Sequence, residues 1–172
     1  MKQSLRAFAL VAALATPVVA AQAMDTVAYK TQVEETIREV ISGNFPSIDK
    51  TLARQDEIIK IGVEGAREFA VDKPEYAKLM QLTIANVDTM KKMEPEQLEA
   101  QWGDGAEAFK AAGFDITKLS QFSAARSHAD TIIHPTTSFV LLSLYKKTGH
   151  KALLEQAKSE LVEVLEHLQH LN

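Results

Sequence analysis

Three residues with side chains capable of binding chemistry follow one another at intervals of four in the chain. Arg126, Asp130 and His134 would line one edge of a helix, because residues four apart are neighbours on a helical surface. A guanidinium, a carboxylate and an imidazole in this order can hold one another as an intrahelical salt bridge. They can also form the charged edge of a binding site, and the spacing leaves both interpretations open.

The dipeptide His134-Pro135 predicts that the helix ends there, because a residue before proline is biased away from helical geometry. We therefore expect one helix to end at about residue 133 and another to begin at 135. An intrahelical salt bridge at this helix end is the favoured interpretation, and a binding site at the junction is the alternative. The N–H groups of a helix start, the hydroxyl of Thr137 and the guanidinium of Arg126 would together attract an anion. This predicts a site for a small anionic ligand, such as a carboxylate, with His128 on its flank.

A second group of candidate residues lies in the last predicted helix, at residues 150–171. Glu163, His167 and His170 would share one face, and two imidazoles with a carboxylate one turn away can ligate Zn, Cu or Ni. The opposite face has an apolar heptad pattern that includes Leu161, which predicts that the histidines face solvent. We expect residues 119–147 to cover this apolar face, and a homodimer is the alternative.

The elements that must position these residues are helices joined by short turns. Prolines stand near the starts of apolar-periodic segments and glycines stand just after their ends, as helix termini favour. The fold class is all-α, a compact bundle of about six to eight helices with antiparallel neighbours. The predicted helices cover residues 25–42, 46–71, 73–93, 95–102, 105–112, 117–133, 135–148 and 150–171.

Two glycines interrupt the second predicted helix, although an internal glycine costs about 1 kcal/mol relative to alanine. Gly62 and Gly65 lie one turn apart on its apolar stripe. They predict that a neighbouring helix packs closely there, with close approach of a ligand or a bend in the helix as the alternatives.

The first 23 residues have the pattern of a secretory signal peptide. Lys2 and Arg6 precede the apolar run 7–15, and Ala21-Gln22-Ala23 fits a cleavage site. The predicted mature chain is one domain, residues 24–172, with a periplasmic or secreted location. No later segment reaches the length of about 18 to 20 apolar residues that a membrane helix needs.

Composition excludes several classes of function. The chain has 23 acidic and 19 basic residues, and a net charge of −4 does not favour nucleic acid, which is bound mainly through clustered Lys and Arg. The absence of cysteine excludes disulfides, thiolate nucleophiles and covalently attached c-type haem. No nucleophile elbow or other catalytic signature is present, so the sequence gives little support for an enzyme.

In its plan the chain is similar to four-helix b-type cytochromes, as an exported helical bundle with histidines in its last helix. That resemblance implies haem ligation by a methionine near the start of the first helix and a core-facing histidine in the last. Met24 and His167 or His170 are the nearest positions here, but the periodicity places both histidines on a polar face. We therefore expect a ligand- or partner-binding module of unknown cofactor, and a metal- or haem-binding bundle is the alternative.

Overall fold

The computed structural model describes residues 24–171, and the predicted signal peptide lies outside this range. The prediction of an all-α bundle is confirmed. The α-helices are α1 (Thr26–Ser42), α2 (Ile48–Asp72), α3 (Ala77–Ala85), α4 (Val87–Met90), α5 (Pro95–Trp102), α6 (Glu107–Ala111), α7 (Ala124–Thr148) and α8 (Ala152–His167). Single 3-10 turns cover Pro74–Tyr76, Ile116–Lys118 and Leu168–His170.

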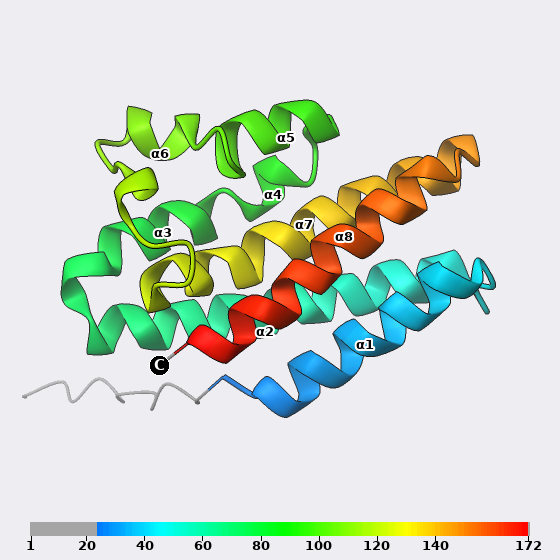
Figure 1. Cartoon of the computed structure of the whole chain (residues 1–172), viewed down its shortest axis with the longest axis horizontal. Helices are drawn as coiled ribbons and strands as arrows, with labels where there is room; N and C mark the ends of the chain where they lie inside the picture. The colour runs from blue at the N-terminus through cyan, green and yellow to red at the C-terminus, as the bar shows by residue number, and fades with distance from the viewer. Residues whose placement is uncertain (1–23, 172) are drawn as a thin grey trace, which may run out of the picture.

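Four long helices, α1, α2, α7 and α8, lie side by side, and the short helices α3 to α6 form a second group over α7 (Figure 1). Helix α7 packs against α8 on one side and α2 on another, while α1 packs against α2 and α8. Gly149 ends α7 at a φ of 71°, a left-handed conformation that suits glycine, and α8 then returns antiparallel along α7.

The prediction of a helix end at His134-Pro135 is wrong. Helix α7 continues through Pro135, so the expected N-terminus with free N–H groups does not exist there. Proline cannot donate to the carbonyl of Thr131, four residues earlier. The hydroxyl of Tyr29 on α1 donates to that carbonyl instead, at 2.7 Å, and both groups are buried. Packing by a distant element thus compensates for the bond that proline removes.

Close helix packing is confirmed at Gly62, whereas Gly65 lies against the side chain of Met24, which precedes α1. A Cβ atom on Gly62 would lie 2.5 Å from the carbonyl oxygen of Thr131, so only glycine lets α2 approach α7 at this level. A Cβ on Gly65 would lie 2.6 Å from the Sδ atom of Met24. Gly62 and Tyr29 therefore both contact the carbonyl of Thr131, the group on α7 that lacks its regular helical hydrogen bond.

The predicted helix over 73–93 is divided at Asn86. The backbone N–H of Asn86 donates to Thr83, three residues back, and its side-chain amide donates to the carbonyl of Leu82 at 2.8 Å. Asparagine competes for backbone groups in this way and favours helix ends. The chain turns here and leads into α5, which reaches over α7 and α8 and contributes to the site described below.

The apolar face of the last helix is covered within the chain, as expected. Leu154, Leu161 and Val164 are buried against α7, α1 and α2. Within residues 24–171 no helix is both long enough and apolar enough to cross a membrane.

Candidate metal centre

Helices α7 and α8 carry the same polar spacing on the faces that meet. Each helix has a hydroxyl or carboxyl residue, a carboxylate three positions later and a histidine four positions after that. The two sets are Ser127, Asp130 and His134 on α7, and Glu160, Glu163 and His167 on α8. Because the helices are antiparallel, each histidine lies opposite the carboxylate of the other set, and the two sets are related by an approximate two-fold rotation.

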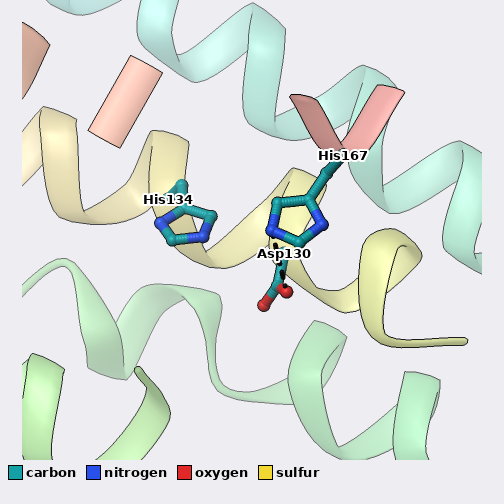
Figure 2. A group of neighbouring side chains, drawn as sticks. All are labelled: Asp130, His134 and His167. Atoms are coloured by element: carbon teal, nitrogen blue, oxygen red, sulfur yellow. Dashed lines mark ion pairs between the residues drawn. The ribbon is translucent and has the colours of Figure 1, made fainter. Parts of the chain in front are cut away.

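The two imidazoles and the two opposing carboxylates form the inner part of the cluster. The Nε2 atom of His167 is 3.3 Å from Oδ2 of Asp130, and the Nε2 atom of His134 is 3.7 Å from Oε2 of Glu163. The imidazole rings are stacked with centroids 5.5 Å apart. Figure 2 shows the two rings next to each other, with the carboxylate of Asp130 directed toward His167. One ligand atom from each of Asp130, His134 and His167 fits within a span of 4.8 Å.

The Nδ1 atom of each histidine is hydrogen-bonded to the first residue of the set on the other helix. The Nδ1–H group of His134 donates to Oε2 of Glu160 at 2.8 Å, and Nδ1 of His167 is 3.2 Å from the hydroxyl of Ser127. A hydrogen bond at Nδ1 fixes the orientation of an imidazole and directs Nε2 toward a common ligand. Both histidines of this cluster are oriented in that way.

A cavity of about 200 Å³ adjoins the cluster. Its lining includes Glu99, Gly103 and Asp104 from α5 and the following turn, in addition to residues of α7 and α8. Within the described part of the chain, five carboxylates and one guanidinium line this cavity, and no apolar side chain larger than glycine does. Its electrostatic character is therefore acidic.

Arg126 is the permanent cation of the cavity. Its Nε atom donates to Oδ2 of Asp130 at 2.9 Å, as the four-residue spacing predicts, and one of its terminal nitrogens is 3.9 Å from Asp104. Burial raises the pKa of Asp130, while His134 and Arg126 act in the opposite direction and do not fully offset it. The salt bridge thus supports an ionised carboxylate in a buried position.

The two histidines titrate in opposite directions although their rings are stacked. Burial lowers the pKa of His134, but the hydrogen bond to Glu160 and the charges of Asp130, Glu160 and Glu163 outweigh it and raise the pKa to about 9. Burial lowers the pKa of His167 to about 4, and the charges of His134 and Arg126 add to that effect. At neutral pH, His167 is therefore neutral and His134 carries a proton.

Three of the residues predicted for binding lie away from the cluster. The ring of His128 stacks on Phe69 with centroids 4.4 Å apart, and its Nε2 is 3.2 Å from the carbonyl of Leu171. The hydroxyl of Thr137 donates to Ile133 within its own helix. His170 lies against Phe122, at a centroid distance of 4.7 Å, and does not line the cavity.

The expectation that the histidines of the last helix face solvent is wrong for His167, of which 2% is exposed. The polar face of α8 that carries His167 packs against the polar face of α7, so each face buries the other. Ser127 and Glu160 were not among the residues predicted for the site. The signal was present in the shared spacing of the two segments, but it becomes a site only when the two helices are known to be antiparallel neighbours.

Comparison with protein-family models, with curated proteins and with solved structures gave no match, so the geometry of this cluster carries the functional argument.

Proposed function

We propose that this chain is an exported metal-binding module that holds one divalent transition-metal ion, for which Zn²⁺ fits best, between α7 and α8. The ligands are the Nε2 atoms of His134 and His167 and the carboxylates of Asp130 and Glu163. The observation that carries the proposal is that both histidines direct Nε2 toward the opposing carboxylates while Nδ1 of each is held from behind.

The distances bring three of these ligands together, because one ligand atom each of Asp130, His134 and His167 lies within 4.8 Å of the others, and Glu163 would complete a four-coordinate set by moving closer. Zinc binds imidazole nitrogen and carboxylate oxygen at about 2.0 to 2.1 Å, which places neighbouring ligands of a tetrahedron about 3.3 Å apart. The pair His167 and Asp130 is already at 3.3 Å, and the pair His134 and Glu163 is at 3.7 Å. Glu163 is the most exposed of the four, with 46% of its side chain accessible, so it has room to adopt another rotamer and close the remaining gap.

The ligand set and the charge favour a cation of intermediate softness. Two imidazoles and two carboxylates suit Zn²⁺ and its neighbours Co²⁺ and Ni²⁺ better than Ca²⁺ or Mg²⁺, which prefer oxygen alone. The proposal of an anionic ligand loses its basis, because it depended on a helix start at Pro135, which is absent. A haem macrocycle needs apolar walls, whereas the walls of this cavity are charged or polar.

A titration with Co²⁺ followed by competition with Zn²⁺ tests the proposal, because tetrahedral Co²⁺ absorbs visible light. Purified protein, treated with a chelator, should bind one Co²⁺ per chain and release it when one equivalent of Zn²⁺ is added. The variant Glu163→Gln should weaken Zn²⁺ binding by about tenfold or more. The matched variant Glu166→Gln, on the exposed side of the same helix, should leave it unchanged.

Two results would overturn the proposal. One is the absence of stoichiometric Co²⁺ or Zn²⁺ binding to protein whose circular dichroism shows the helical fold. The other is an equal effect of Glu163→Gln and Glu166→Gln, which would place any bound metal on the protein surface instead of in the cluster.

A further inference from the structure

We infer that the groove next to the metal centre, between α5, α7 and α8, binds a small organic cation with an apolar tail, such as a primary alkylamine. The groove has a volume of about 430 Å³. Volumes of about 300 to 1,000 Å³ are typical of sites for small organic molecules, whereas a hydrated ion needs much less space.

The floor of the groove is apolar. Leu141 and Leu144 of α7 and Leu153 of α8 line it, and Pro95 adds an apolar contact from α5. Leu144 and Leu153 are only partly buried. An alkyl chain lying on this floor would remove apolar surface from water on both partners, and that burial is the main source of affinity for such a ligand.

The rim of the groove is acidic. Glu96 and Glu99 of α5, Glu94 just before it and Glu160 of α8 line it, and within residues 24–171 no Lys, Arg or His does. Glu160 is already paired with His134 at 2.8 Å, whereas Glu94, Glu96 and Glu99 are exposed. Three exposed carboxylates disfavour a fatty acid and favour an ammonium head group. The combination of an apolar floor with a rim of one charge sign therefore selects a cationic amphiphile.

Two glutamates join this groove to the cavity of the metal centre. Glu99 and Glu160 line both, and Glu160 is the residue that holds Nδ1 of His134. The ammonium group of a ligand in the groove would thus lie beside the proposed metal ligands and would not coordinate the ion. The inference does not depend on metal binding, because the carboxylates and leucines of the groove are present with or without an ion.

The test measures binding of hexylammonium, hexanoate and hexanol to chelator-treated, metal-free protein by titration calorimetry, with amide chemical shifts to locate the ligand. Hexylammonium should bind most tightly, and its resonance changes should map to α5, α7 and the first half of α8. Lengthening the chain to heptyl and octyl should strengthen binding by about fourfold per methylene group.

The variant Glu96→Gln should weaken hexylammonium binding, whereas Glu107→Gln on exposed α6 should not. Both sites are exposed, so neither change threatens the fold. Hexanoate binding as tightly as hexylammonium, an affinity independent of chain length, or equal effects of the two variants would each overturn the inference. Because metal is removed beforehand, a negative result here leaves the metal proposal standing, and failure of the metal titration leaves this one standing.

Discussion

We expect a metal ion that binds at the cluster to displace one proton, which would come from His134. In the metal-free protein the neighbouring carboxylates of Glu160, Asp130 and Glu163 outweigh the effect of burial and raise the pKa of this histidine to about 9. His167 contributes no proton at neutral pH, because burial holds its pKa at about 4. Zn²⁺ can ligate Nε2 of His134 only after that nitrogen has lost its proton.

The size of the effect follows from the pKa of His134. At pH 7 a group with a pKa of about 9 is protonated in about 99% of molecules, so apparent Zn²⁺ affinity should be about 100-fold below its limit, or about 2.7 kcal/mol. Apparent Zn²⁺ affinity should rise with pH, because a higher pH makes the proton of His134 easier to remove. Between pH 6 and pH 8, affinity should therefore increase by about tenfold per pH unit.

Titration calorimetry with Zn²⁺ at pH 7, in buffers of different ionisation enthalpy, counts the released protons directly. One proton per bound ion is the expected result. In Glu160→Gln the neutral amide no longer raises the pKa of His134, so fewer protons should be released and the dependence on pH should weaken. Glu166→Gln is the matched control and should behave as the parent. Zn²⁺ binding without proton release at pH 7 would refute the role of His134 as a ligand.

Two further predictions concern the metal-free protein. Its free energy of unfolding should be greatest near pH 6.5, because His134 loses stabilising charge as pH rises toward about 9, and His167 is forced to protonate as pH falls toward about 4. Each histidine can change the free energy of unfolding by about 3 kcal/mol. Urea unfolding between pH 4 and pH 9 with a chelator present would measure this. A free energy of unfolding without a maximum in this range would contradict the protonation states given to the two histidines. Tyr29→Phe should cost about 1 to 3 kcal/mol by leaving the buried carbonyl of Thr131 without a donor. The cost should be smaller in Pro135→Ala, which restores an N–H group, and strictly additive effects in a double-mutant cycle would refute this compensation.

Local pattern was sufficient to predict the class of fold, because helical periodicity and the order of prolines and glycines depend on neighbouring residues. It was insufficient at Pro135, where the rule that proline ends a helix was outweighed by contacts from elsewhere. The hydroxyl that replaces the missing donor belongs to Tyr29, 102 residues away along the chain, and Gly62 gives α2 the room to approach. Nothing in the sequence near residue 135 carries that information.

All four proposed ligands were among the candidate residues in the sequence, but as two separate groups, and that the two groups meet could not be predicted, for a related reason. The spacing of Arg126, Asp130 and His134 indicated a polar edge, and their mutual contact was confirmed for Arg126 and Asp130 at 2.9 Å. The partner stripe on α8 was assigned to solvent, because an amphipathic helix ordinarily exposes its polar face. That rule fails when two polar stripes face each other, and such a pairing is a property of the tertiary arrangement.

The polar faces of α7 and α8 bury more negative than positive side chains against each other. This excess of negative charge favours a divalent cation. Asp130, Glu160 and Glu163 place three carboxylates around the imidazoles, and Arg126 supplies one permanent positive charge. A protonated His134 adds a second, which leaves this group with one excess negative charge, apart from the exposed Glu99 and Asp104 that also line the cavity. A divalent cation that replaces this proton brings two charges and makes the group neutral. Since unpaired buried charge is costly, we expect a divalent metal ion to stabilise the cluster more than the single proton does.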